Sequence, residues 1–324
     1  MATLASRNGY RAKIIFLATI IGIVALLHYL TPTEPHAFHK LHIILRKLYF
    51  LPPVIAAAWF GLRGACITTL IVSVFFVLHA FLDWPGNYME QANQVGEVVG
   101  FWGAGVISGW LFDRQRALLQ EVANANEETL LGLVSALDLR EHNTRLHSQR
   151  VREYTDLLAR RFGLNEKNRR EIGFGALLHD VGKIAVPDRI LLKPDKLTDD
   201  EWKEMHKHPE AGYRMVKRIG FLKEAAQIVR THHERYDGKG YPQGLKGGEI
   251  PLGARLFMVA DVYDALTSKR PYSSPMTYEA ATAVMLGEGD RHFDPAVLAA
   301  FMAIAPEELR LIAERYQELD CQSE

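Results

Sequence analysis

Cysteine is scarce in this chain: only two occur among 324 residues, Cys66 inside an apolar run and Cys321 near the end. Two cysteines cannot form a framework of disulfides, and neither lies in a Cys-x-x-Cys pattern. The polar part of the chain is therefore predicted to be reduced and cytosolic. Any metal site must use His and carboxylate ligands, which suit iron, manganese or zinc.

The chain also lacks a net charge, because 38 basic and 38 acidic residues cancel. This balance gives no electrostatic footprint for a DNA or RNA polymer. Charge is nevertheless unevenly distributed: long apolar runs precede residue 112, and Arg, Lys, Glu and Asp are frequent after it. The length allows about two domains, so we expect a membrane region at 1–112 and a cytosolic part beyond it.

No small-residue cleavage site follows the first apolar run, residues 14–30. Basic residues precede this run and a polar turn follows it, which favours a membrane anchor over a signal peptide. Further apolar stretches lie at about 49–61, 65–82 and 95–112. A span needs roughly 20 residues, so the stretch at 49–61 must use its flanks. We predict a bundle of about four transmembrane helices, which serves either as a sensor or as a plain anchor.

The connections between these spans differ in character. Gly61 to Gly64 predict a tight turn, residues 83–93 a polar loop, and residues 40–47 an amphipathic segment at the interface. Glu97 is costly in lipid, so it is expected to face the bundle or the interface. The histidines of this region show no spacing typical of a haem pair: His28, His36, His39, His42 and His79.

Basic clusters set the predicted orientation. The cytoplasmic side takes the clusters at 7–13, at Arg63 and at 114–116, while the cluster at 40–47 falls outside and conflicts with it. An even number of spans returns the chain to the cytoplasm. The prediction is a multi-pass protein of the cytoplasmic membrane with its polar C-terminal domain in the cytoplasm.

Residues 113–140 contain no proline and read as one helix continuing the last span. Its apolar residues change face part-way, which fits a dimeric coiled coil with a phase break or a single helix packing on the domain. We place a linker helix at 113–132 and a domain at 133–324. That domain shows no alternating strand pattern and is predicted to be all-α, with a capping box at Thr198–Glu201 and a loop at 236–251.

The chemistry concentrates at His179-Asp180-Val181-Gly182-Lys183, which places an imidazole, a carboxylate and a cation in one short turn. Asp261 lies in an apolar helix, where a carboxylate is costly unless it is paired or bound to metal. Other candidate ligands lie at wide intervals: His147, His208, His232 and His233. Because one metal needs fewer ligands, two ions bridged by Asp180 are the economical arrangement. Lys183 and Arg270 would then contact phosphates.

These residues resemble the HD-GYP domain. The resemblance rests on the HDVGK sequence at 179–183, the HHERYDGKGYP sequence at 232–242, residues 250–255, residues 259–268 and Arg270-Pro271-Tyr272. It covers about residues 133–302. It implies a metal-dependent phosphodiesterase that opens cyclic di-GMP to linear pGpG and sometimes to GMP.

The resemblance also implies the roles of individual residues. Asp180 and Lys183 are catalytic, Arg270 contacts substrate phosphate, and Gly240, Tyr241 and Pro242 shape the rim of the site and are proposed to contact GGDEF partners. The metal ligands are His147, His179, Asp180, His208, His232, His233 and Asp261. Members with a third metal carry Glu where this chain has Asn143, so we predict two ions, iron or manganese. Ser273 replaces a residue that is basic in many members, which leaves the second hydrolysis open.

Other readings predict different behaviour. A non-catalytic receptor would bind cyclic di-GMP without turnover, and a related phosphohydrolase would prefer another cyclic dinucleotide. The expected partners are cyclic di-GMP, a second copy of the chain, GGDEF-domain proteins acting in trans, and the membrane.

Overall fold

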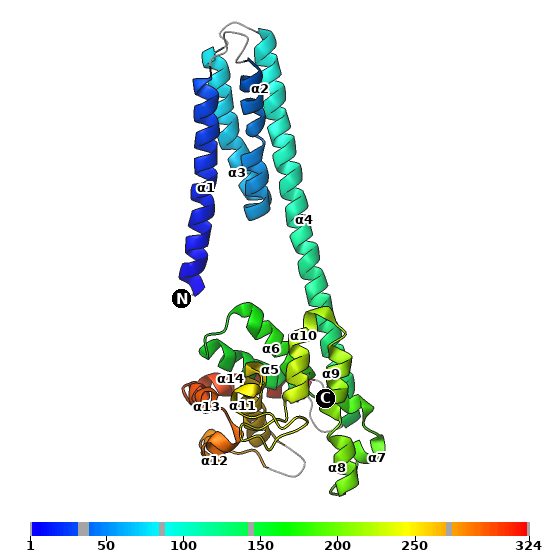
Figure 1. The fold of residues 1–324 in the computed structure, drawn as a ribbon. Coiled ribbons are helices and arrows are strands. Elements are labelled where there is room, and N and C mark those ends of the chain that lie inside the picture. Colours follow the sequence, from blue (N-terminus) through cyan, green and yellow to red (C-terminus); the bar gives the residue numbers. More distant parts are fainter. Residues whose placement is uncertain (1, 32–38, 84–87, 142–145, 270–273, 323–324) are drawn as a thin grey trace. The chain divides into compact units, whose positions relative to one another are not determined.

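The computed structural model describes residues 2–31, 39–83, 88–141, 146–269 and 274–322. Within these ranges every regular element is a helix and no strand occurs, which confirms the prediction of an all-α chain. The chain divides into two compact units, residues 1–125 and 126–324 (Figure 1). Each unit is described separately below.

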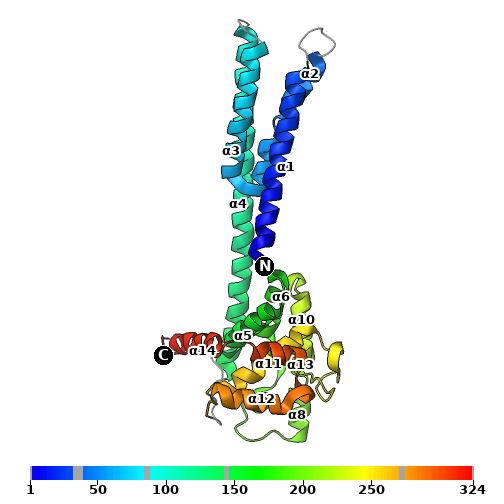
Figure 2. The same ribbon diagram turned by 90° about the vertical axis from the view of Figure 1, so that its left-hand side faces the viewer.

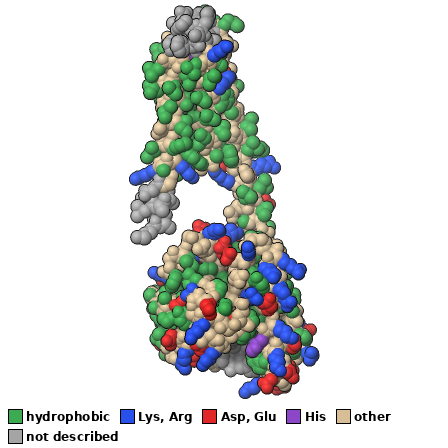
Figure 3. Space-filling model, in the orientation of Figure 1, with side chains coloured by type: hydrophobic (Ala, Val, Ile, Leu, Met, Phe, Trp, Pro, Cys, Tyr) green, Lys and Arg blue, Asp and Glu red, His purple; other side chains and the backbone are tan. Residues whose placement is uncertain are grey.

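The first unit contains α1 (Ala2–Leu30), α2 (His39–Leu48), α3 (Leu51–Asp83) and the beginning of α4 (Tyr88–Glu141). Figures 1 and 2 show α1 lying along α3. Hydrophobic side chains cover much of the face of this unit seen in Figure 3. Three stretches are long and apolar enough to cross a membrane, 9–30, 40–82 and 91–140, where four separate spans were predicted.

The stretch at 40–82 reverses direction part-way. The rings of His42 and His79 have centroids 5.2 Å apart, whereas a straight helix spanning the residues between them would be about 55 Å long. The reversal lies at Gly61, whose φ is 68° and whose backbone is not helical. A side chain there would collide with Asp113, whose carboxylate accepts the Leu62 N–H at 2.8 Å. The predicted turn is therefore present at Gly61.

One detail of the first unit differs from prediction. Helix α4 already begins at Tyr88, so residues 88–93 are helical and the polar loop is shorter than expected. Helix α2 buries His42 and Leu45 and exposes Leu41 and Ile44, so one side packs within the unit, and its place at a membrane interface stays a prediction. Glu97 does face other helices, because its carboxylate pairs with Lys47 Nζ at 2.5 Å.

The second unit is built around two hydrophobic clusters. One joins α5, α6, α11, α12, α13 and α14 through residues such as Phe257 and Phe301, and the other joins the end of α4 to α6, α9 and α10. The capping box at Thr198 is confirmed. The helices are α5 (His147–Arg161), α6 (Glu166–Leu178), α7 (Asp188–Leu191), α8 (Asp199–Met205), α9 (His208–Val216), α10 (Lys223–Thr231), α11 (Leu252–Thr267), α12 (Tyr278–His292), α13 (Pro295–Met302) and α14 (Pro306–Gln322). Short 3₁₀ turns occur at η1 (Val181–Ala185), η2 (Gly220–Leu222) and η3 (Gly247–Glu249).

Helix α4 runs without interruption through the predicted linker, which confirms that residues 113–140 are helical. Leu130 and Val134 are buried against α6 and α10. Val122 and Leu118, about two and three turns before Leu130, are 58% and 50% exposed. The end of the helix thus packs on the domain, and the part before it keeps an apolar face for a coiled coil.

Candidate active site

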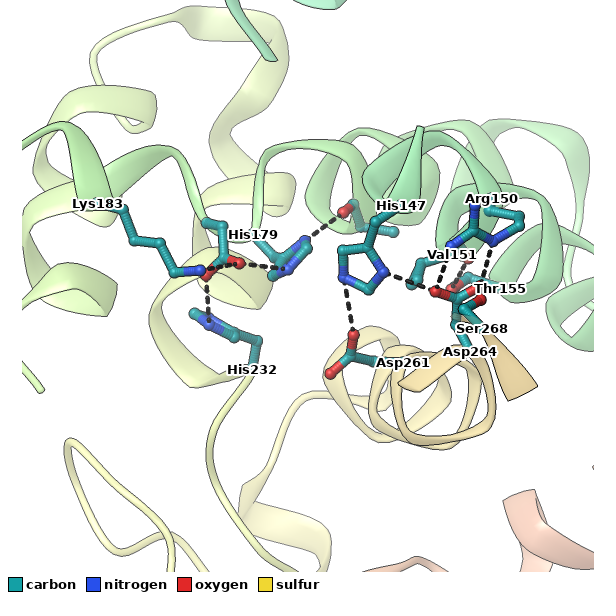
Figure 4. Close-up of polar contacts among 12 residues, drawn as sticks. His147, Arg150, Val151, Thr155, His179, Lys183, His232, Asp261, Asp264 and Ser268 are labelled. Carbon is teal, nitrogen blue, oxygen red and sulfur yellow. Dashed lines mark hydrogen bonds and ion pairs between the residues drawn. The ribbon is translucent and has the colours of Figure 1, made fainter. Parts of the chain in front are cut away.

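Most of the candidate ligands come from the ends of helices in the second unit, and Figure 4 shows His147, His179, His232 and Asp261 among them. His147 is the first residue of α5 and His208 the first of α9. His179 and Asp180 follow α6, His232 and His233 follow α10, and Asp261 lies in the middle of α11. Helix ends and one buried helix therefore place seven residues distant in the sequence around one centre.

Gly182 allows the turn that carries Lys183 to approach α9. A side chain at this position would lie 1.9 Å from the carbonyl oxygen of His208. Only glycine fits such a close backbone approach. The glycine of the HDVGK sequence thus brings His179 and Asp180 next to His208.

The seven residues form two groups of donors. Asp180, His208, His232 and His233 make one group, and His147, His179 and Asp261 make the other. The donor atoms within each group lie within 4.8 Å of one another. The sequence-predicted ligands are all brought together, and their role as ligands stays a prediction.

Asp180 lies between the two groups and directs one oxygen toward each. Its Oδ1 is 3.4 Å from His208 Nε2 and 3.8 Å from His232 Nε2. Its Oδ2 is 3.0 Å from His179 Nε2 and 2.8 Å from Lys183 Nζ. A carboxylate placed in this way can bridge two cations.

Three of the imidazoles are fixed in one tautomer by backbone carbonyls. Each Nδ1 lies 2.8 Å from the carbonyl oxygen three residues earlier in the chain, so it donates a proton there and leaves Nε2 as an acceptor. These pairs are His179 with Ala176, His208 with Met205 and His232 with Val229. The Nε2 atoms of His208 and His232 face each other at 3.2 Å. Lone pairs directed at one point suit a metal ion.

His147 is held by a different partner, the buried carboxylate of Asp264. His147 Nδ1 lies 2.7 Å from Asp264 Oδ2, and His147 Nε2 lies 3.3 Å from Asp261 Oδ1. Arg150 donates two hydrogen bonds to the same carboxylate, from Nε to Oδ1 at 2.5 Å and from a terminal nitrogen to Oδ2 at 2.9 Å. The Asp264 side chain is 1% exposed, so this network is shielded from water.

Burial and neighbouring charge set the protonation of the site without metal. Burial opposes a charge on His147, but hydrogen bonds to Asp261 and Asp264 outweigh it and raise its pKa to about 10. Burial lowers the pKa of His232 to about 3. Burial also works against ionisation of Asp180, yet His179 and Lys183 hold its pKa well below the usual range. The carboxylates are thus ionised at neutral pH, as metal ligands must be.

The loop after α10 carries Gly240, Tyr241 and Pro242 to the edge of the site. The Tyr241 ring stacks between His206, with centroids 4.0 Å apart, and the ligand candidate His233, at 4.6 Å. The buried Glu234 carboxylate holds this loop by accepting backbone N–H groups of Gln243 and Leu245 at 2.8 and 3.0 Å. A rigid aromatic face therefore adjoins the first donor group.

Three predicted positions lie outside the described residues: Arg270, Asn143 and Ser273. The phosphate contact of Arg270 and the two-metal argument from Asn143 stay predictions. Sequence reasoning also missed residues that the structure places at the site. Asp264 has the same signal as Asp261, a carboxylate in an apolar helix, and Glu234 adjoins the His pair. His206 was taken as solvent-facing; it is exposed, yet its ring covers Tyr241.

Comparison with known proteins supports this assignment of the domain. The chain is 44% identical over 194 residues to the "Cyclic di-GMP phosphodiesterase response regulator RpfG" of Xanthomonas campestris, covering 59% of this chain and 51% of that protein. It is 39% identical over 183 residues to "3'3'-cGAMP-specific phosphodiesterase 2" of Vibrio cholerae, covering 56% and 35%. It is 38% identical over 194 residues to a "Cyclic di-GMP phosphodiesterase" of Thermotoga maritima, covering 58% and 53%.

The chain therefore spans between about a third and a half of the length of these relatives. The family described as "HD domain" matches residues 133–297, just over half of the chain, and the match includes all seven ligand candidates. The chain belongs to the HD domain family.

Proposed function

We propose that this chain is a metal-dependent phosphodiesterase of the HD-GYP type that opens cyclic di-GMP to linear pGpG, with the second hydrolysis to GMP left open. One observation carries the proposal: Asp180 lies between two groups of His and Asp donors, and Lys183 Nζ is 2.8 Å from Asp180 Oδ2. The relatives named cyclic di-GMP phosphodiesterases support the substrate.

Two divalent ions, iron or manganese, fit the donor sets. Each group mixes imidazoles, which are neutral when they bind a metal, with one ionised carboxylate, a combination that suits such ions. When bound, the ions would supply an activated water and neutralise charge on phosphate oxygens. Seven ligands for two ions leave coordination positions open for substrate.

The remaining residues act on the dinucleotide. Lys183 is a compact cation that can balance charge on a phosphate oxygen or on the leaving oxygen. The Tyr241 ring offers a flat face beside His233, and Gly240 and Pro242 shape the rim next to it. Arg270 is proposed to contact a second phosphate.

The N-terminal region is proposed to anchor the enzyme in the bacterial cytoplasmic membrane. We assign 1–112 to a bundle of four passes, 113–132 to the linker helix and 133–324 to the catalytic domain in the cytoplasm. The reversal at Gly61 supports four passes, because it divides the stretch at 40–82 into two arms. The exposed apolar face of the linker supports a homodimer, and a GGDEF-domain protein would act in trans.

The test uses the full chain, purified in detergent and loaded with manganese or with iron under reducing conditions. Cyclic di-GMP should be consumed and pGpG should appear, as measured by chromatography with mass detection. His179→Ala should abolish turnover, since it removes a donor that faces Asp180. A chain with bound metal that leaves cyclic di-GMP intact contradicts the proposal, and tight binding without turnover identifies a receptor instead.

A second substrate is favoured by the relatives named 3'3'-cGAMP-specific, which are 39% and 36% identical to this chain. The two cyclic dinucleotides differ in one base, while the phosphates that face the metals are alike. Competition between equal concentrations of both substrates, followed by their separate products, decides which is preferred.

A further inference from the structure

Three buried histidines converge in the first unit, far along the chain from the HD residues. His28 lies near the end of α1, His42 in the first turns of α2, and His79 near the end of α3. Their ring centroids are 3.9 Å apart for His28 and His79, 4.5 Å for His28 and His42, and 5.2 Å for His42 and His79. Each side chain is at most 1% exposed.

The surroundings of this His triad are aromatic. Tyr49 and Phe76 have ring centroids 5.4 and 5.9 Å from that of His28. Neither ring nitrogen of His28 has a hydrogen-bond partner within the described chain. Buried polar atoms are almost always satisfied, so a fully buried imidazole without a partner calls for one. A neutral imidazole offers one nitrogen lone pair, so a partner that accepts lone pairs and fits between three rings would satisfy it.

A single metal ion meets both requirements. One nitrogen of each ring can be chosen so that all three lie within 4.8 Å of one another. Three nitrogens at the usual distance from zinc lie about 3.3 Å apart, so small ring rotations suffice. A haem does not fit, because a porphyrin separates its two axial rings, whereas His28 and His79 stack directly.

The arginine nearest the triad has an acidic partner. Arg46 lies one turn after His42, and its guanidinium is 3.9 Å from the Glu97 carboxylate, which Lys47 also contacts. The carboxylate offsets the arginine, so the positive group is not alone beside the rings. Three neutral imidazoles without a thiolate suit Zn²⁺, Cu²⁺ or Ni²⁺.

We propose that His28, His42 and His79 bind one transition-metal ion, separate from the metals of the HD domain. Such an ion ties together the ends of α1 and α3 and the beginning of α2. It gives the first unit a specific inorganic ligand, where the sequence alone showed no ligand-binding pattern.

The test must separate this ion from those of the HD domain. The test chain is full length and carries Asp180→Asn, His208→Gln and Asp261→Asn, so that each HD group keeps only two histidines. It is purified in detergent, stripped with a chelator, given ZnCl₂ and passed through a desalting column. Bound zinc per chain is then measured by mass spectrometry. We expect one equivalent to remain, and His28→Gln or His79→Gln to weaken its binding at least about tenfold.

His292→Gln in the same background is the matched control, because it removes an imidazole that belongs to none of the three groups. It should leave the retained zinc unchanged. Circular dichroism checks that each variant keeps its helices. Should the glutamine variants unfold, the paramagnetic resonance spectrum of Cu²⁺ in the background chain reports the ligands directly, with nitrogen couplings expected. A folded background chain that retains no zinc, copper or nickel overturns the proposal, as does a copper spectrum without nitrogen ligands.

Discussion

Asp264 should control metal binding although it contacts no predicted metal position. Its Oδ2 accepts from His147 Nδ1 at 2.7 Å, which leaves His147 Nε2 free to face Asp261. Replacement by asparagine exchanges one acceptor for a donor. If the amide nitrogen faces His147, the ring must carry its proton on Nε2, the nitrogen needed for metal. If the amide is turned the other way, its N–H groups take the place of Oδ1 and oppose the Nε–H of Arg150.

The expected loss of metal affinity can be taken from other metal-bound histidines whose second ring nitrogen donates to a carboxylate. Loss of such a partner weakens metal binding about 10- to 100-fold, which corresponds to about 1.4 to 2.7 kcal/mol. The group of His147, His179 and Asp261 should be affected, while the group of Asp180, His208, His232 and His233 keeps its own carbonyl partners. Asp264→Asn is therefore expected to retain one ion tightly and the other weakly.

The measurement is competition with a chromophoric chelator, using manganese and the purified full chain. Arg150→Met is the matched control, because it breaks the same buried ion pair and leaves the His147–Asp264 hydrogen bond in place. It should lower thermal stability and keep both ions. The reasoning is refuted if folded Asp264→Asn binds both ions as the original chain does, or if Arg150→Met loses as much affinity.

Three further predictions concern the same site. Lys183→Met should lower kcat about 100-fold with metal content unchanged, as measured by steady-state kinetics and metal analysis, since it removes only a cation. The pKa of His147 without metal is about 10, so below that pH metal must displace a proton. The apparent affinity of the site for metal should therefore rise up to about tenfold per pH unit between about pH 6.5 and 8.5, as measured by chelator competition. A flat profile would contradict the assignment of His147 as a metal ligand. Arg140 donates to the Lys183 carbonyl at 3.1 Å and pairs with Asp188. Arg140→Ala should lower kcat about 10-fold or more by releasing this turn, and Asp188→Ala should have a smaller effect.

The helical fold could be predicted because hydrophobic periodicity and caps are local signals. Thr198 and Glu201 form the predicted capping box, and the helix through residues 113–140 is continuous. The sequence did not decide whether Leu130 and Val134 pack in a coiled coil or on the domain, because an apolar helix face does not show which surface it contacts. The start of α4 at Tyr88 was missed because the polar residues there resemble a loop.

Part of the candidate site could also be predicted from the sequence, and part required the structure. Residues whose chemistry is costly without a partner, such as Asp261 in an apolar helix, could be singled out from sequence. Asp264 has the same burial cost. The two carboxylates are three positions apart on α11, and which of them faces the other donors depends on how the helix is rotated about its axis. The carbonyl partners of His179, His208 and His232 follow from helix ends and could not be assigned without coordinates.

The His triad of the first unit shows why spacing alone was insufficient there. His42 and His79 are 37 positions apart, which matches no metal motif on one helix. They meet only because the chain reverses at Gly61, where Asp113 accepts the Leu62 N–H. A residue other than glycine would be strained at this positive φ and would displace that carboxylate from the Leu62 N–H, so the turn would be destabilised. The turn thus determines whether His79 can reach His28 and His42, so the proposed metal site and the fold of the first unit depend on the same glycine.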